Sequence, residues 1–359
     1  MRIAIDAREL AGRPTGVGRY LAEILREWGE LAGARTHEFV LCAPSGVAIP
    51  DGLTASRAIA PGAGTAWEQF TLPRLVATAD ADVLFAPGYT GPLLTRVPMV
   101  VTVHDVSFAA HPEWFGWREG LRRRLVTRLA ARRAVKVITV SDFSKDEIVS
   151  HLDIPESKVE VIYSGVTRMP AAESVHRDGA TVLFVGSLFN RRHIAELVAG
   201  FEIVGRRHPR ARLELVGDNR TRPYVDVERL IAQTSVADRI RARAYVPDGE
   251  LAALYRDARV FVFLSEYEGF ALTPLEALGA GIPIVLLNTD VAHEIYGSAA
   301  IYVERPEPAL IAAALEHALF DEAERDRVLA AAAVQIERYS WGECAHRTLQ
   351  ILLACARNR

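Results

Sequence analysis

The sequence has few cysteines and no long apolar run, and both shortages exclude whole classes of protein. Cys42, Cys344 and Cys355 are scattered over 359 residues without a C-x-x-C pair, so neither a zinc ribbon nor a disulfide framework is indicated. No apolar stretch is long enough to span a bilayer. Because Met1 to Asp6 lead directly into a strand-like pattern, we expect no leader peptide and a cytoplasmic location.

A basic excess is missing as well. The chain has 42 Lys and Arg against 45 Asp and Glu, a net charge of −3. It therefore lacks the positive field that nucleic-acid binding needs, and we expect no nucleic-acid partner. Half of the residues are hydrophobic and 24% are charged, as in an ordinary globular protein, and the length suits two domains.

The most informative stretch is RVFVFLSEYEGFALTPLEALGAGIP, residues 259–283. It opens with an apolar run, 260–264, that predicts a buried parallel strand. After a loop we expect a helix whose start is a capping box, with Thr273 as the N-cap, Pro274 as the first helical residue and Glu276 as the third. A helix start offers free amides and a partial positive charge, which suit a phosphate.

Two carboxylates, Glu268 and Glu276, bracket this loop with seven residues between them. Together with the strand, the Gly-Phe and Thr-Pro pairs and the closing GAGIP, the segment EGFALTPLE resembles the E-x7-E motif of GT4-like retaining glycosyltransferases. The resemblance implies that Glu268 orients hydroxyls of the donor sugar and acts in catalysis. It implies that Glu276 holds the ribose, and that the amides of Phe270, Ala271 and Leu272 hold the diphosphate. Alone, the same two glutamates would be a helix cap and a solvated loop charge.

Two stretches of the first half resemble the same family. After the first strand pattern comes the loop AGRPTGVGRY, which contains Gly16 and leads to a helix expected from Tyr20. The resemblance implies that this loop lies near the donor diphosphate. The run TVHD places His104 at the end of an apolar strand, where open α/β sheets bind ligands. By resemblance, His104 reaches the donor sugar and the reacting centre.

Two stretches of the second half complete the predicted donor site. Arg191 and Arg192 lie in the turn GSLFNRRH, where the resemblance implies diphosphate binding. A helix start disfavours cations, so two arginines there indicate an anion nearby. Tyr245 lies in a turn that sits beside the nucleobase in the family. Stacking on the base and simple packing both stay open for it.

A strongly basic segment, WREGLRRRLVTRLAARRAVK, occupies residues 117–136. Leu121, Leu125 and Leu129 fall at helical spacing and form one apolar stripe, which we expect to serve the core. A basic amphipathic helix also suits an anionic membrane surface. Peripheral contact with the inner face of the plasma membrane therefore stays open beside a solvated helix packed on the sheet.

Strand and helix patterns alternate through two halves of the chain and predict an α/β fold. The resemblance implies a GT-B architecture, two Rossmann-like doubly wound domains facing a central cleft. We expect an acceptor-side domain at 1–166, a polar linker at 167–179 and a donor-side domain at 180–340. A C-terminal helix, 341–359, would pack back on the first domain.

The predicted activity is transfer of a hexose, with retained configuration, from a nucleotide-diphosphate sugar to a glycan or lipid-linked glycan. No cofactor and no metal are expected, because arginines and amides would neutralise the diphosphate. GDP-mannose is our first choice of donor, since HDVSF and HPEWF look like mannosyltransferase segments. Open alternatives are a GT-B sugar-phosphate enzyme, such as a phosphorylase or nucleotide-sugar epimerase, and a non-catalytic nucleotide- or glycan-binding module. Leu21 breaks the G-x-G-x-x-G fingerprint and disfavours a nicotinamide dehydrogenase.

Overall fold

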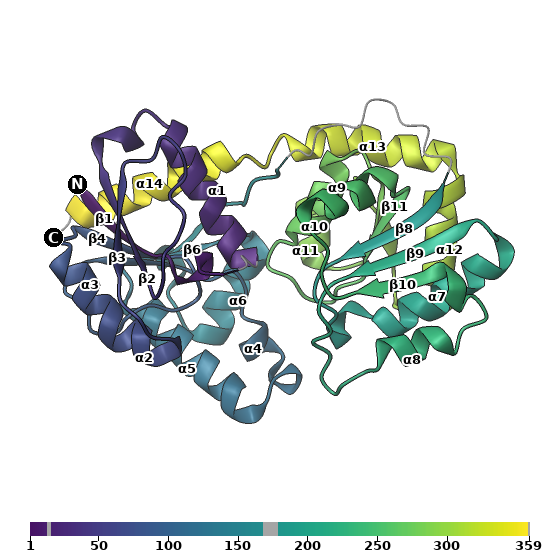
Figure 1. Cartoon of the computed structure of the whole chain (residues 1–359), viewed down its shortest axis with the longest axis horizontal. Coiled ribbons are helices and arrows are strands. Elements are labelled where there is room, and N and C mark those ends of the chain that lie inside the picture. The colour runs from purple at the N-terminus through teal and green to yellow at the C-terminus, as the bar shows by residue number, and fades with distance from the viewer. Residues whose placement is uncertain (13–15, 168–178, 358–359) are drawn as a thin grey trace. The chain divides into compact units, whose positions relative to one another are not determined.

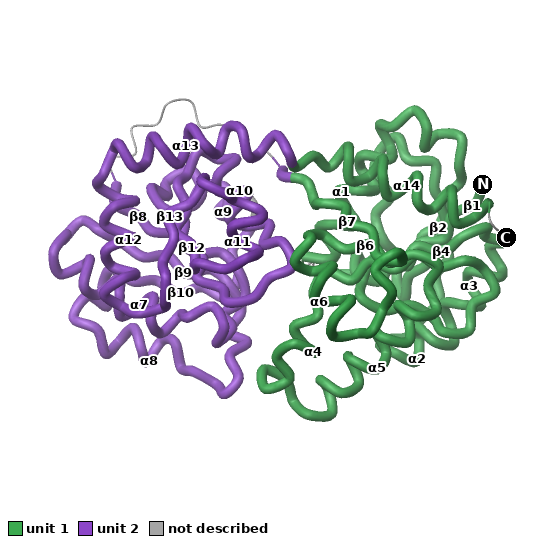
Figure 2. Tube along the Cα trace, turned by 180° about the vertical axis from the view of Figure 1, so that it is seen from behind, with its two compact units in different colours: residues 1–165, 339–359 green, residues 166–338 purple. Residues whose placement is uncertain are grey.

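The computed structural model describes residues 1–12, 16–167 and 179–357. It forms two compact units, which Figure 2 colours separately. Unit 1 comprises Met1–Gly165 together with Tyr339–Arg359, and unit 2 comprises Val166–Arg338. Of the linker expected at 167–179, residues 168–178 lie outside the described part of the chain.

Unit 1 is built on a seven-stranded sheet in which every pair of neighbours is parallel. The strand order is β3-β2-β1-β4-β5-β6-β7. Strand β1, inside the sheet, is almost fully buried, as expected for a parallel strand covered on both faces. The strands are β1 Arg2–Asp6, β2 Glu38–Ala43, β3 Ala55–Ile59, β4 Val83–Ala86, β5 Met99–Thr102, β6 Lys136–Thr139 and β7 Val159–Val161.

Helices cover this sheet, and the last helix of the chain is one of them. Figure 1 shows α14 (Trp341–Arg357) alongside α1 (Gly16–Glu30). There the buried indole of Trp28 donates a hydrogen bond to the carbonyl of Ala345 at 2.8 Å. The other helices of unit 1 are η1 Arg8–Leu10, η2 Ala34–Thr36, α2 Gly64–Ala66, η3 Trp67–Thr71, α3 Leu72–Thr78, α4 Ser107–Ala110, η4 Pro112–Trp114, α5 Trp117–Arg133, α6 Asp142–Leu152 and η5 Glu156–Lys158.

Unit 2 repeats the plan with six parallel strands in the order β10-β9-β8-β11-β12-β13. The strands are β8 Ala180–Val185, β9 Ala211–Val216, β10 Ile240–Arg243, β11 Val260–Phe263, β12 Ile284–Leu287 and β13 Ile301–Val303. The helices are η6 Asn190–Arg192, α7 Ile194–Arg207, α8 Val227–Ala232, η7 Ala237–Arg239, α9 Asp248–Asp257, α10 Leu272–Gly279, α11 Asp290–Tyr296, α12 Pro308–Phe320 and α13 Glu322–Ile336.

The predicted fold class, two parallel doubly wound α/β sheets, is confirmed. Several elements differ from expectation, β3 and α1 among them. Strand β3 was not predicted, because it is a mostly exposed edge strand without an apolar run. Helix α1 begins at Gly16 rather than at Tyr20, because Gly18 is buried in the helix and tertiary packing outweighs the low helix propensity of glycine.

The leucine stripe of α5 faces solvent, so the expectation that it serves the core is wrong. Leu121, Leu125 and Leu129 are 61%, 53% and 39% exposed. The buried positions of α5 are instead small, namely Gly120, Thr127, Ala130 and Ala131. Small residues let the helix backbone approach the sheet closely, and the leucines then project from the opposite side. Within the described residues, no helix combines the length and apolar character needed to cross a membrane.

Candidate functional site

Both sheets have a point where the strand order reverses, and loops from the two flanking strands meet there. In unit 2 this point lies between β8 and β11. Ligands of open α/β sheets bind at such a point, outside the carboxyl ends of the strands. The turn after β8 carries Arg191 and Arg192, and the loop after β11 carries Glu268, Phe270 and Ala271.

Arg192 and Glu268 form an ion pair across this switch point. Nε and Nη2 of Arg192 donate to Oε1 of Glu268 at 3.0 and 2.7 Å, and the hydroxyl of Ser265 donates to the same oxygen at 2.8 Å. Nη1 of Arg192 donates to the carbonyl of Ser187 at 2.9 Å. Both side chains of the pair are mostly buried, so water screens their attraction only weakly. Among the described residues, no hydrogen bond reaches the second oxygen of Glu268, Oε2.

Aromatic rings and a backbone bond hold both arginines of the turn. The guanidinium of Arg192 lies 4.6 Å from the ring centre of Phe263, and that of Arg191 lies 4.2 Å from the ring centre of Phe189. The amide of Glu266 donates to the carbonyl of Arg191 at 2.9 Å. The β8 turn and the β11 loop are therefore tied together through main chain as well as side chains.

His193 is a site residue that sequence reasoning missed. It has a left-handed backbone (φ +52°) and joins η6 to α7. Its Nε2 lies 2.8 Å from Glu266, and its Nδ1 lies 3.6 Å from Glu196. Burial opposes protonation of His193, but the hydrogen bond with Glu196 and the charges of both glutamates outweigh burial and raise its pKa. The place of His193 directly after Arg191 and Arg192 in the turn GSLFNRRH is a sequence signal that could have pointed to it.

The start of α10 differs from the predicted capping box. The helix begins at Leu272, and its N-cap is Ala271, which has a left-handed backbone (φ +61°) and provides no side-chain cap. Thr273 is therefore the second helical residue and Glu276 the fifth, too far along to form the box. Within the described residues, the amides of Ala271, Leu272 and Thr273 have no hydrogen-bond partner. Such open amides at a helix N-terminus can bind an anion.

Two backbone carbonyls next to these amides are held by a tyrosine hydroxyl. The hydroxyl of Tyr296 donates to the carbonyls of Phe270 (3.3 Å) and Ala271. A small cavity of about 20 Å³ separates Glu268 from Tyr296. It has room for one water molecule rather than for a sugar ring.

The remaining predicted donor residues of unit 2 lie outside this cluster. Glu276 is buried on α10, one and a half turns beyond Ala271. Tyr245 follows β10 and is more than half exposed, as a residue that stacks on a base would be. Neither lines the small cavity of Glu268.

The predicted residues of unit 1 are His104 and Gly16. Gly16 is the first residue of α1 and not part of a loop. His104 lies just beyond β5, and its Nε2 lies 2.8 Å from the carbonyl of Pro87, so Nε2 carries the proton. The ring of Tyr20 meets His104 edge-on at 4.8 Å. Burial lowers the pKa of His104, although the bond to Pro87 and the charge of Asp105 oppose this.

In the described part of the chain, no group of three or more His, Cys, Asp or Glu side chains is arranged to hold a metal ion. The charge at the candidate site is instead organised by arginines, glutamates and backbone amides.

The chain matches two family models that together span most of it. "Glycosyltransferase Family 4" covers residues 14–168 and "Glycosyl transferases group 1" covers residues 167–335. An uncharacterized glycosyltransferase of Methanocaldococcus jannaschii is 30% identical over 72% of this chain and 70% of its own length. The O-antigen chain mannosyltransferase B of Escherichia coli is 28% identical over 70% of this chain and 68% of its own.

Solved structures agree on the fold. Anabaena HepE, crystallised with UDP and glucose, superposes with a TM-score of 0.77 over 99% of this chain and 100% of its own, at 18% identity. The fold, the motif and these relatives lead to one assignment. The chain belongs to the GT4, or group 1, glycosyltransferases of GT-B fold, enzymes that transfer a sugar from a nucleotide-sugar donor.

Proposed function

We propose that this enzyme transfers a hexose, with retained configuration and without a metal ion, to a glycan or a lipid-linked glycan. The observation that supports this most directly is the Arg192–Glu268 pair beside the open amides at the start of α10. It supports the proposal because a cation and backbone donors next to a leaving diphosphate would stabilise the developing charge. A carboxylate oxygen, Oε2 of Glu268, is available for a sugar hydroxyl.

Each predicted residue takes one role in this proposal. Arg191 and Arg192 bind the diphosphate together with the amides of residues 270–272, and Gly16 lets the main chain of α1 approach the same group. Glu268 orients the donor sugar, and Glu276 holds the ribose. Tyr245 stacks on the base. His104, neutral at pH 7 because burial lowers its pKa, contributes an imidazole to the reacting centre.

Mannose remains our first choice of donor sugar, carried by GDP. Relatives named as mannosyltransferases recur among the matches, including the E. coli enzyme. The HepE structure holds UDP and glucose instead, but at 18% identity that likeness supports the fold alone. UDP-glucose is therefore the competitor that a donor assay has to include.

The acceptor side of the proposal includes a membrane surface. The α5 face of exposed Leu121, Leu125 and Leu129 continues to Trp117, which is 73% exposed. Arginines flank this stripe along the whole helix. Apolar side chains between arginines suit the boundary of an anionic leaflet, so we place the enzyme in the cytoplasm with contact to the inner face of the plasma membrane.

The proposal is tested with a thermal-shift panel of GDP, UDP, ADP and their sugars, in Mg²⁺ and in EDTA. A nucleotide at 100 times its Kd stabilises the folded state by about 2.7 kcal/mol, which raises the Tm by roughly 5–10 °C. We expect GDP and GDP-mannose to stabilise the protein equally well in EDTA. Arg191→Gln should reduce the shift, whereas Arg305→Gln, an exposed arginine elsewhere in unit 2, should not.

Three outcomes would contradict parts of the proposal. A larger shift with UDP or ADP would replace the donor. Loss of the shift in EDTA would contradict the metal-independent diphosphate site. No shift with any nucleotide would contradict the donor site as a whole.

A further inference from the structure

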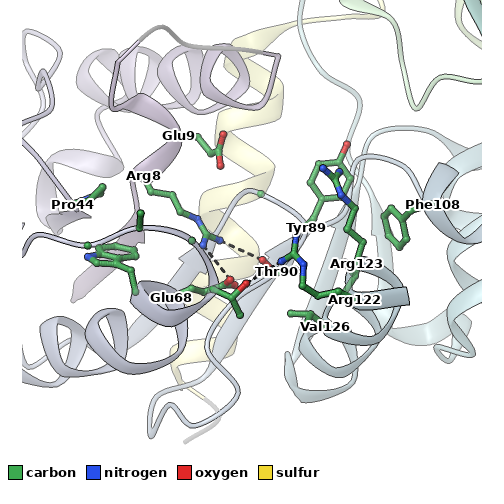
Figure 3. Close-up of a pocket in the computed structure, with 17 residues that line it drawn as sticks. Arg8, Glu9, Pro44, Glu68, Tyr89, Thr90, Phe108, Arg122, Arg123 and Val126 are labelled. Carbon is green, nitrogen blue, oxygen red and sulfur yellow. Dashed lines mark hydrogen bonds and ion pairs between the residues drawn. The ribbon is translucent and has the colours of Figure 1, made fainter. Parts of the chain in front are cut away.

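A cavity of about 440 Å³ in unit 1 is lined by none of the residues assigned to the donor site. It is large enough for one or two sugar rings. Figure 3 shows its lining, to which the segments following β1, β2, β3, β4 and β5 all contribute, together with α5. The order β2-β1-β4 reverses between β1 and β4, so the cavity lies at the switch point where doubly wound sheets bind ligands.

The floor of the cavity is a fixed charge network around Arg8. Its guanidinium lies 3.1 Å from Asp6 and 3.1 Å from Glu68, and it also donates to the hydroxyl of Thr90 at 3.3 Å. Burial raises the pKa of Asp6 to about 6, against the opposing charge of Arg8. Glu68 is buried, and its Oε1 has no hydrogen-bond partner among the described residues. A buried acceptor of this kind suits a ligand hydroxyl.

The rim carries a surplus of positive charge. Arg122 and Arg123 reach it from α5. Nη1 of Arg122 donates to the hydroxyl of Thr65 at 2.9 Å, and within the described residues Arg122 makes no ion pair. Arg123 is paired with Glu119 at 2.8 Å. On the α5 side, two guanidinium groups and the single carboxylate of Glu119 leave a net cation, and the guanidinium fork is suited to phosphate. The acidic side chain of the lining that is not buried, Glu9, comes from the segment after β1.

One wall of the cavity is continuous with His104. Gly88, Tyr89 and Thr90 line it, and the carbonyl of Pro87, just before them, is the hydrogen-bond partner of His104. Tyr89 has a left-handed backbone (φ +67°), a strained state for a bulky residue that is often found at ligand sites. Its ring centre lies 5.5 Å from that of His104. A ligand in this cavity is therefore adjacent to the histidine assigned to the reacting centre.

From this arrangement we infer that the cavity binds the acceptor as a saccharide joined to a phosphate or diphosphate. The phosphate lies at the rim between Arg122 and Arg123, and the sugar extends inward to Tyr89 and Glu68. This inference rests on the proposed transferase activity and narrows its acceptor. A sugar phosphate in solution and a sugar diphosphate on a lipid share this chemistry. The lipid form would place its chain near the leucines of the same helix.

The inference is tested by calorimetric titration of the full chain with three probes. The probes are glucose 1-phosphate, farnesyl diphosphate and the neutral methyl glucoside. Both phosphorylated probes should bind, and the neutral glycoside should bind at least about tenfold more weakly, since hydrogen bonds to charged groups contribute 1.5–3 kcal/mol. Arg122→Gln and Arg123→Gln should each raise the Kd of the phosphorylated probes by about tenfold or more. Arg124→Gln, on the same helix but outside the cavity, should not.

Binding of GDP and UDP is measured on the same samples, which separates this inference from the proposed function. If a nucleotide binds but the rim variants bind phosphorylated probes as the wild type does, the phosphate subsite is wrong and the donor proposal stands. Equal affinity for the neutral glycoside also overturns the subsite. If no nucleotide binds, the donor proposal fails, and the rim variants still decide the subsite. Tighter binding of farnesyl diphosphate, weakened by Leu121→Gln, would assign the subsite to a lipid-linked acceptor, and equal binding of both phosphates to a soluble one.

Discussion

Three residues other than glycine have left-handed backbones in segments that follow strands next to the two switch points. They are Tyr89 after β4, His193 after β8 and Ala271 after β11. A left-handed backbone costs a residue other than glycine about 1–3 kcal/mol. Each of the three adjoins a group to which a ligand role is assigned. The two other positive-φ residues besides glycine in the described part of the chain, Asp80 and Asp153, are aspartates, which adopt this backbone more readily.

His193 gives the site a pH dependence of known sign. Its pKa in the folded protein is raised above 6.5 by Glu196 and Glu266, in spite of burial. The stabilisation is therefore fully present below pH 6.5 and is lost as the pH rises through the folded-state pKa. We expect His193→Asn, which tolerates the left-handed backbone, to remove this component. Hydrogen exchange of α7 peptides at pH 6 and pH 9 measures it.

The loss of protection has to be compared between the wild type and His193→Asn, because other groups also titrate between pH 6 and pH 9. Wild type should lose more protection of α7 between pH 6 and pH 9 than His193→Asn does. Peptides from the far end of α7, away from His193, serve as an internal reference. An equal loss in both proteins at the start of α7 would contradict the assignment.

At the scale of the element, the start of α10 is strained and uncapped. Replacing Ala271 by glycine removes a left-handed cost of about 1–2 kcal/mol and adds about 0.5–1 kcal/mol of backbone entropy. We expect Ala271→Gly to raise the free energy of unfolding by up to about 1 kcal/mol. Urea titration followed by circular dichroism measures this. Ala280→Gly, at an ordinary negative φ of −85°, should lower stability instead, and stabilisation by both would show that backbone strain is not the cause.

Helix α5 is the element most open to direct test. Leu121 and Leu125 each already expose more than half of their surface to water, so burial of either side chain in lipid is worth about 1 kcal/mol. We expect Leu121→Gln and Leu125→Gln each to weaken binding to anionic phospholipid vesicles roughly fivefold. Stability should change by less than about 0.5 kcal/mol.

Controls separate lipid contact from charge alone. Val334→Gln removes an apolar residue of α13 in unit 2 that is even more exposed than these leucines, and it should leave vesicle binding unchanged. Vesicles of neutral phospholipid should bind more weakly, since the flanking arginines then lack a partner. Binding that ignores both leucine substitutions would contradict a membrane role for the stripe.

Helices α5 and α10 also show what hydrophobic periodicity and cap signals cannot predict. Periodicity correctly predicts that 117–133 is helical, but it cannot tell which face is inside when one side is leucine and the other is glycine, threonine and alanine. It assigned the larger side chains to the core, and the structure buries the small ones. The start of α10 was misplaced because Thr-Pro is a good cap in general, whereas Ala271 begins the helix two residues earlier in a conformation that alanine rarely adopts.

At the scale of the whole molecule, the parallel fold was predictable because buried parallel strands are continuous apolar runs separated by helical patterns. Glu268 and Glu276 could be proposed as donor-binding residues from the sequence because a linear motif carries them. The contact between Arg192 and Glu268 was not, since it joins positions 76 apart whose meeting depends on strand order. The cavity of unit 1 was missed for the same reason, because five separate loops and a helix line it.

The stability of unit 1 depends on α14. Tryptophan fluorescence can follow the unfolding of unit 1 separately from that of unit 2. All five tryptophans lie in unit 1. Trp28→Phe removes the buried hydrogen bond to the carbonyl of Ala345 and leaves a small void. We expect it to lower the free energy of unfolding by about 2–4 kcal/mol in urea. The exposed Trp117→Phe should change it by less than about 0.5 kcal/mol, and equal effects would mean that α14 contributes little.

The return of α14 to the first unit also sets an order of events on the ribosome. Domains generally fold as they emerge, the first one first. Here unit 1 is the first to be translated and the last to be completed, because its covering helix follows residue 338. Unit 2 can fold while Trp28 and its neighbours, already translated, still lack the helix α14 that packs against them. A truncated product that ends at residue 338 would therefore destabilise unit 1, which holds the N-terminal residues, rather than unit 2.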